Sequence, residues 1–272
     1  LAFIRTRFDQ SSALILQAEP YVTGLQERID FLMLRSSLAL FWSSDWERAG
    51  RDLDEALHLT QGSGNLRHWY LFSIYMGPEF TLLPGMLERL EAFCQAARQR
   101  DPAGISPLRL GVEDTMASIH LRRGRLQPAI EMGRDALMVK DQLGGYPFLG
   151  LNAAITLAAA YTALGNYPAA EDYLLRAIQQ VSAAELNQAQ TGEILYPIGR
   201  LRWLEGRYDE AAQAYQKMSA IEHRLPFVDA LQKMLSGLID ISSKRYPQAE
   251  ESLLDAVRLQ SAGSISQIYG SA

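Results

Sequence analysis

Small and bulky apolar positions recur along the chain at intervals of 38 to 41 residues. In each copy a small residue sets the register, a bulky apolar residue precedes it by three positions, and a second small residue follows it by seven. The register column, which is mostly alanine, reads Ser11, Ala49, Leu90, Ala129, Ala170, Ala211 and Ala249. Seven copies in one register exclude a chance alignment and predict a repeat architecture.

The columns around this register predict a helix hairpin. The bulky residues are Phe8, Trp46, Leu87, Leu126, Tyr167, Tyr208 and Tyr246, and the second small column is Ala18, Ala56, Ala97, Ala136, Ala177, Met218 and Ala256. Two positions before the bulky residue stand Thr6, Ser44, Gly85, Gly124, Gly165, Gly206 and Lys244. Glycine accepts the left-handed backbone conformation that ends a helix, so this column predicts the turn between a first and a second helix.

The residues beside the turn predict how the second helix begins. Asp45 and Asn166 stand where a side chain can cap the new helix, and Pro168 and Pro247 fall in its first turn, where a missing N–H costs nothing. Because small residues seven positions apart share one helix face, they let the partner helix approach closely.

The first helices carry their own apolar face. Before the turn at Gly165 this face is Ala154, Leu157, Ala158 and Tyr161, and before Ser44 it is Met33, Ser36, Ser37 and Leu40. In the second copy it is Trp69, Phe72, Ser73 and Met76, after which Gly77-Pro78 ends the helix. Residues 77–84 (GPEFTLLP) are therefore expected to be an inserted loop.

These hairpins resemble the tetratricopeptide repeat over essentially the whole chain, because a Gly-x-Tyr-x2-Ala turn follows a bulky-x2-apolar-small-x2-Tyr face. The period near 40 residues exceeds the usual repeat of about 34. Longer units are similar to those in the sensor region of MalT-type ATP-dependent LuxR-like regulators, and also to those of kinesin light chains and other adaptors. The opening residues LAFIRTRFDQSSALILQAEP resemble the MalT type most.

The resemblance implies an all-α fold, a right-handed superhelical solenoid of tetratricopeptide-like hairpins in which residues 1–272 form one domain. Residues 1–5 have the character of the last turns of a first helix, and Ser264 to Tyr269 that of the start of another. The ends of a solenoid need polar caps, and neither end has one. We therefore expect the chain to be a fragment of a longer multidomain protein.

Composition narrows the classes of function. The chain is 48% hydrophobic, which is enough for a core, and its net charge of -5 argues against a nucleic-acid-binding surface. Cys94 is the single cysteine, which we interpret as a small buried hydrophobe in a reducing compartment. Neither a signal peptide nor an apolar run of roughly 18 residues is present. We expect a cytoplasmic protein that contacts neither membrane nor nucleic acid.

The sequence offers no catalytic constellation. The histidines His58, His68, His120 and His223 lack metal-ligand spacing, and we interpret each as a surface or cap residue. The GSGN stretch at Gly62 follows a helix, which favours a turn over a phosphate-binding loop. The acidic pairs Glu171-Asp172 and Glu250-Glu251 are interpreted as solvated charge on second helices. No enzyme activity, cofactor or metal is expected.

The concave surface is where we expect binding, because first helices line it in solenoids of this type. By resemblance, the residues facing it include Glu193, Tyr196, Arg200 and Trp203 in the fifth unit, Asn152 in the fourth, Asp114 and Arg122 in the third, and Trp42 near the first turn. Tyr196, Arg200 and Trp203 form one stripe that suits a peptide, a sugar face or an anion. The alternative is that Tyr196 and Trp203 pack against a neighbouring hairpin, Arg200 pairs with Glu193, and Trp42 also packs.

The expected function therefore rests on binding at the concave surface and not on a catalytic site. The leading hypothesis is a non-catalytic regulatory module, the effector-sensing or partner-docking segment of a larger MalT-like transcriptional regulator, which holds a protein, peptide or small effector in the groove and contacts other domains of its parent chain. The alternative is a passive adaptor that binds a peptide or helix of another protein. An enzyme would require Asp114, Glu193 and Arg200 to converge.

Overall fold

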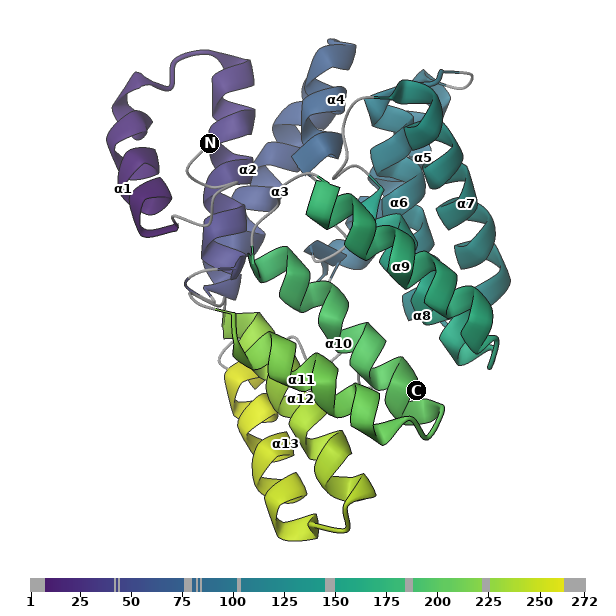
Figure 1. The fold of residues 1–272 in the computed structure, drawn as a ribbon. Coiled ribbons are helices and arrows are strands. Elements are labelled where there is room, and N and C mark those ends of the chain that lie inside the picture. Colours follow the sequence, from purple (N-terminus) through teal and green to yellow (C-terminus); the bar gives the residue numbers. More distant parts are fainter. Residues whose placement is uncertain are drawn as a thin grey trace.

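The computed structural model describes residues 8–41, 43, 45–75, 80–81, 83, 85–101, 104–144, 150–183, 188–221 and 226–261. These ranges contain α-helices and a short 3-10 helix, and no strand occurs within them. The α-helices are α1 Phe8–Ala18, α2 Leu25–Phe41, α3 Trp46–Gly62, α4 Leu66–Tyr75, α5 Met86–Arg100, α6 Pro107–Arg122, α7 Leu126–Leu143, α8 Leu151–Ala163, α9 Tyr167–Ala183, α10 Gln188–Leu204, α11 Tyr208–Ser219, α12 Pro226–Ser242 and α13 Tyr246–Ser261. The expected all-α fold is confirmed (Figure 1).

Helices α2 to α13 stack as a series of hairpins. The even-numbered first helices form a ladder, in which each helix from α2 to α12 contacts the next even-numbered one. From α3 onward each odd-numbered second helix also contacts the first helix that follows it. This arrangement, visible in Figure 1, is the one expected of a solenoid, in which a hairpin buries its apolar faces only against its neighbours. The handedness of the superhelix stays a prediction.

The predicted hairpin turns are confirmed where the structure describes them. The bulky column opens the second helices: α3, α7, α9, α11 and α13 begin at that residue, and α5 begins one position before Leu87. The Asp45 side chain accepts a hydrogen bond from the Arg48 amide at 3.0 Å, and Asn166 Oδ1 accepts one from the Ala169 amide at 3.3 Å. Both expected caps are thus present.

One backbone conformation closes five hairpins. Gly85, Gly124, Gly165, Gly206 and Lys244 have φ between 58° and 76°, in the left-handed region. At Gly165 the amide donates to the Thr162 carbonyl, and the Asn166 amide reaches back to the Tyr161 carbonyl at 2.9 Å, which satisfies carbonyls at the helix end. Lys244 keeps this geometry although its Cβ makes the conformation unfavourable.

The small columns are buried as predicted. From the second copy on, every residue of the register column and of the second small column is at most 3% exposed, whereas Ala18 of the first copy is exposed. Close approach is visible at Ser36, whose hydroxyl donates to the Ala49 carbonyl at 2.7 Å across the α2–α3 hairpin. A Cβ built on Gly237 would lie 2.6 Å from Leu253, which shows how closely α12 and α13 pack.

The α4–α5 unit departs from this pattern. The backbone of α4 lies closer to α2 and α6 than to α5. Aromatic side chains bridge the two helices, because Phe93 of α5 stacks on Trp69 at 4.8 Å and meets Phe72 at 4.7 Å between ring centroids. The predicted insertion contributes Phe80 and Leu83, which are 1% and 2% exposed and belong to the same core.

The beginning of the ladder also contacts its far end. Leu38, near the end of α2, is 6% exposed and belongs to the same buried apolar cluster as Leu195 and Tyr196 of α10 and Leu235 of α12. Figure 1 draws the end of α2 beside the start of α10. The helices between them therefore curve far enough to bring residues almost 160 positions apart into one core.

Some predictions fall on residues that the structure does not describe. These include Trp42, His223, the turn positions Thr6 and Ser44, residues 1–5 and Ser264 to Tyr269. Whether residues 1–272 form one domain, and whether they belong to a longer protein, stay predictions.

Candidate functional site

The predicted groove residues lie on three stacked first helices. Asp114 and Arg122 belong to α6, Asn152 to α8, and Glu193, Tyr196, Arg200 and Trp203 to α10. All of them except Tyr196 are half-buried, so they are neither core residues nor freely solvated. Trp42 lies outside the described residues.

Tyr196 is a correction to the predicted stripe. Its side chain is 2% exposed and belongs to the cluster that joins α10 and α12 to Leu38 of α2. Burial raises the pKa of Tyr196 to about 12. The packing alternative therefore holds for this residue, because the curvature of the ladder brings α2 onto the face that a straighter array would leave open.

Trp203 of α10 is hydrogen-bonded to the neighbouring first helix. Its indole Nε1 donates a hydrogen bond to Ser242 Oγ of α12 at 2.5 Å, and the ring remains half-buried. Ser242 in turn donates to the Leu238 carbonyl at 3.0 Å. One end of the indole is thus fixed to the neighbouring first helix, while part of its surface remains accessible.

Arg200 lies one turn before Trp203 on the same helix. Whether Arg200 pairs with Glu193, as the packing alternative requires, stays a prediction. Asp114 is in α6, and α8 packs between α6 and α10 in the ladder.

Exposed apolar side chains lie at the carboxyl ends of three successive first helices, one of which carries Arg200 and Trp203. Leu164 follows α8 and is 53% exposed, Leu204 ends α10 at 36%, and Ile241 near the end of α12 is 37% exposed. We call Leu164, Arg200, Trp203, Leu204, Ile241 and Ser242 the α8–α10–α12 rim. Leu164, Ile241 and Ser242 were not among the predicted binding residues, although the apolar character of Leu164 and Ile241 near the ends of first helices is a signal that could have been used.

An ion-pair network orients α10 behind the rim. Arg202 is 9% exposed and pairs with Glu171 of α9, with Glu205 at 3.0 Å and with Glu210 of α11 at 3.4 Å. The hydrogen bond with Glu171 raises the pKa of Arg202 and lowers that of the Glu171 carboxyl. Glu171 was expected to be a solvated charge, but it instead ties α9 to the next hairpin.

The environments of the histidines and of the cysteine are those of structural residues. His68 is buried, and its Nδ1 lies 2.6 Å from Ser63 Oγ in the predicted GSGN turn, while His58 is exposed. Burial lowers the pKa of His120 and raises that of the Cys94 thiol, which is fully buried as expected. Within the described ranges no three histidine, cysteine, aspartate or glutamate residues are grouped so that they could hold a metal ion.

The length and apolar character of the helices also bear on whether one of them could cross a membrane. In the part of the chain that the structure describes, none combines the length and the apolar character that spanning a bilayer requires.

Comparison with known proteins identifies the central repeats. A tetratricopeptide repeat family model matches residues 151–221, which comprise α8 to α11. A 70-residue segment is 37% identical to Protein O-mannosyl-transferase TMTC1 of Homo sapiens, which corresponds to 26% of this chain and 7% of that protein. A structural likeness exists to the crystal structure of BtubC (BKLC) from P. vanneervenii, with a TM-score of 0.48, 16% identity, and coverage of 94% of this chain and 90% of that chain.

The family match supports a tetratricopeptide-repeat domain. Repeats of this class typically serve as non-catalytic scaffolds that bind proteins or peptides on an extended surface. The matched residues include α8 and α10 with Leu164, Arg200, Trp203 and Leu204 of the rim.

Proposed function

We propose that this chain is a non-catalytic binding module that docks a segment of a partner protein on the α8–α10–α12 rim. The observation that carries the proposal is the coincidence of the family match at residues 151–221 with the helices that supply most of the rim. Tyr196 has no direct role in this docking, since it is buried.

The chemistry of the rim suggests the kind of segment. Leu164, Leu204 and Ile241 are exposed large apolar groups at the ends of successive first helices, and a contiguous apolar patch there would be typical of an interaction surface. Half-buried Trp203 resembles the aromatic anchors that contribute most to binding at interfaces. Arg200 adds a cation whose bidentate hydrogen-bonding capacity suits a carboxylate. The proposed partner segment therefore has apolar residues beside an aspartate or glutamate.

The finer form of the proposal is regulatory. In this form the chain is the sensing or docking segment of a MalT-like transcriptional regulator, and a protein, peptide or small effector in the groove biases the activity of other domains. The alternative is a passive adaptor that only holds its partner. An ATPase and a DNA-binding helix-turn-helix encoded in the same gene would support the regulator, whereas their absence from the gene would support the adaptor.

Selection from a phage-displayed library of short random peptides tests the docking surface. We expect the selected peptides to contain an acidic residue beside apolar ones, and Arg200→Glu to weaken their binding at least about tenfold, because like charge replaces opposite charge. Arg51→Glu is the matched control, since Arg51 is an exposed arginine on α3. Peptides that bind both variants equally would exclude the rim.

Substitution of Trp203 distinguishes a role in docking from a role in folding. We expect Trp203→Ala to weaken peptide binding more than it lowers the melting temperature, because the ring is only half-buried. Ser242→Ala removes the hydrogen-bond acceptor and leaves the ring, so it should change binding less. A large loss of stability with unchanged binding would mean that Trp203 serves the core alone.

A further inference from the structure

Part of the predicted groove face is buried inside the molecule itself. Leu38 and the predicted groove residue Arg200 occupy equivalent positions of the repeat, six residues before the turn. Arg200 is half-buried, whereas Leu38 is 6% exposed and belongs to the same buried cluster as Tyr196, another predicted groove residue. Two positions that face the groove in the repeat pattern therefore lie within one core, and no other molecule can reach them there.

The contact that buries this face involves few side chains from the start of the ladder. The cluster consists mainly of residues from α10 to α12. Among its described members only Leu38 of α2, and Ile15 of α1 packed against it, come from the first three helices. In the described part of the chain α2 and α10 also have much less backbone contact than α2 and α3. We call the packing of Leu38 and Ile15 on this cluster the closing contact.

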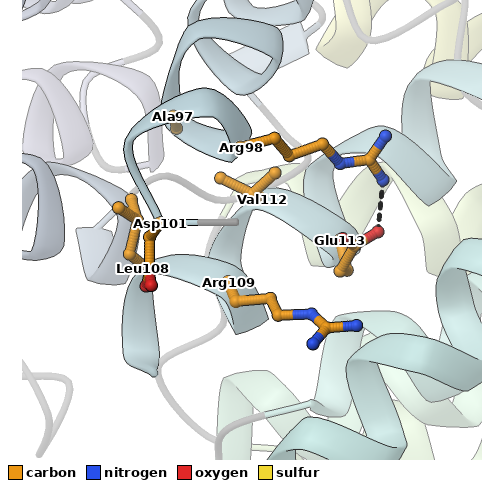
Figure 2. Close-up of a pocket in the computed structure, with 7 residues that line it drawn as sticks. All are labelled: Ala97, Arg98, Asp101, Leu108, Arg109, Val112 and Glu113. Atoms are coloured by element: carbon orange, nitrogen blue, oxygen red, sulfur yellow. Dashed lines mark hydrogen bonds and ion pairs between the residues drawn. The ribbon is translucent and has the colours of Figure 1, made fainter. Parts of the chain in front are cut away.

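Helices α2 to α6, on one side of the closing contact, are joined into one body. A single buried apolar cluster extends from α2 to α6. Arg35 of α2 pairs with Asp52 of α3 at 2.7 Å, and Arg98 of α5 pairs with Glu113 of α6, as Figure 2 shows. These contacts do not involve the closing contact, so the body can keep its structure without it.

Helices α9 to α12, on the other side, are joined in the same way. The ion pairs of Arg202 link α9, α10 and α11, and the cluster around Tyr196 extends to α12. Between the two bodies, α6 to α10 are connected through three smaller apolar clusters. Because each hairpin contacts its neighbours, small rotations at successive interfaces add up along the ladder. Such rotations can separate α2 from α10 without breaking either body.

We propose that the closing contact is autoinhibitory: Leu38 occupies the apolar cluster that contains Tyr196, and it must leave before an apolar side chain of a partner protein can bind there. The present occupant indicates the chemistry of that partner, since Leu38 is an aliphatic side chain presented by a helix. A partner that binds only the open form shifts the equilibrium toward it. The rim residues Arg200 and Trp203 are not fully buried in the closed form, so docking on the rim does not require opening and the two proposals can fail separately.

Small-angle X-ray scattering of the full chain tests whether Leu38 holds the ladder closed. Leu38→Asp should increase the maximum dimension, because an isolated charge is costly in an apolar cluster. Leu38→Ala should increase it less, and Leu38→Met, which keeps a similar apolar volume, should leave it unchanged. Leu25→Asp is the matched control, since Leu25 is 43% exposed on the same helix. Unchanged dimensions in Leu38→Asp, with the helical content verified by circular dichroism, would overturn the proposal.

Hydroxyl-radical footprinting read by mass spectrometry distinguishes opening from unfolding. In the wild type Tyr196 is 2% exposed and should be protected, whereas Tyr246 is 62% exposed and should react. We expect Leu38→Asp to raise the reactivity of Tyr196 relative to Tyr246 at least about threefold, as for a local opening. Trp69, which is 1% exposed in the α2–α6 body, should stay protected.

Two outcomes of the footprinting would contradict the proposal. If Tyr196 stays protected in Leu38→Asp, the closing contact does not control access to the cluster. If Tyr196 and Trp69 become reactive together in both Leu38→Asp and Leu38→Ala, the contact belongs to the folding core and cannot open by itself. Neither outcome would affect the docking of a peptide on the rim.

Discussion

The hairpins α8–α9 and α4–α5 occupy equivalent places in the repeat but pack in different ways. In α8–α9 the facing residues are alanines, with Ala154, Ala158, Ala170 and Ala177 at most 1% exposed. In α4–α5 the register residue is Leu90, and the space between the helices contains Trp69, Phe72 and Phe93. Small residues allow close backbone contact, whereas large ones separate the helices and replace that contact with side-chain packing.

This difference shows that one repeat can tolerate two kinds of core. The α4–α5 unit has little direct backbone contact between its two helices, and the insertion supplies Phe80 and Leu83 to the same cluster. The family match covers two of the regular hairpins, α8–α9 and α10–α11. The register is therefore kept by the columns at the turn, while the residues between the helices are free to vary as long as the volume is filled.

The largest predicted effect compares the aromatic core of α4–α5 with the alanine core of α8–α9 at one equivalent position of the repeat. Phe93 and Tyr173 both stand three residues after the register residue, and Phe93 is 0% exposed whereas Tyr173 is half-buried. We expect Phe93→Ala to lower the free energy of unfolding by about 3–5 kcal/mol, because it leaves a cavity. Tyr173→Ala should cost clearly less. Urea unfolding followed by circular dichroism measures both, and equal losses would mean that the two cores are energetically alike.

A substitution in the register column tests the close approach itself. Ala170→Leu places the residue of the α5 column into the α8–α9 interface, where Ala170 is 0% exposed. We expect it to cost about 1–3 kcal/mol, because added methyl groups overpack a filled core. At an exposed position of the same helix, such as Gln179, the change to leucine should have little effect. A neutral Ala170→Leu would show that the alanine column does not limit the helix separation.

The parts of the fold that sequence predicts are those determined by neighbours in the chain. The turn at Gly165, the cap at Asp45 and the buried alanines all depend on contacts within one hairpin, so a local pattern is enough to reveal them. Lys244 has the same left-handed turn without glycine, and only its place in the column predicted it.

The candidate sites were harder to predict because they depend on contacts between hairpins. Tyr196 fits the groove pattern, but Leu38 of α2 belongs to its cluster, and no period along the sequence indicates that the ladder curves that far. The ion pair between Arg98 of α5 and Glu113 of α6 likewise joins two hairpins. Such pairing depends on the angle between two helices, which the sequence analysis did not address.

A smaller effect concerns the turn that both kinds of hairpin share. Gly165 has φ of 72°, and a Cβ added there would meet nothing within 4 Å, so Gly165→Ala should cost about 1 kcal/mol through backbone strain alone. Lys244→Gly should stabilise the chain by about 0.5 kcal/mol, because relief of strain is partly offset by the entropy of glycine. Thermal unfolding of the two variants measures both changes. If Lys244→Gly destabilises the chain, contacts of the lysine side chain outweigh the strain.

The smallest predicted effect concerns the ion pairs that link hairpins. In the regular region Arg202 holds Glu171, whose side chain is 30% exposed, and the pair should contribute about 0.2–1 kcal/mol at neutral pH. The folded-state pKa of Glu171 is lowered below its ordinary value of 4.5, so this contribution is fully present above pH 4.5 and is lost as the pH falls through the folded pKa.

Comparing the wild-type chain with Glu171→Gln isolates that carboxylate from all the others that titrate in acid. The difference in free energy of unfolding should favour the wild type at neutral pH and decrease as the pH falls through the lowered folded-state pKa of Glu171, because a protonated glutamate and a glutamine are both uncharged. Added salt should reduce the neutral-pH difference, since the pair is partly exposed. A difference that persists unchanged below the folded-state pKa of Glu171 would mean that Glu171 joins α9 to α10 through packing and not through its charge.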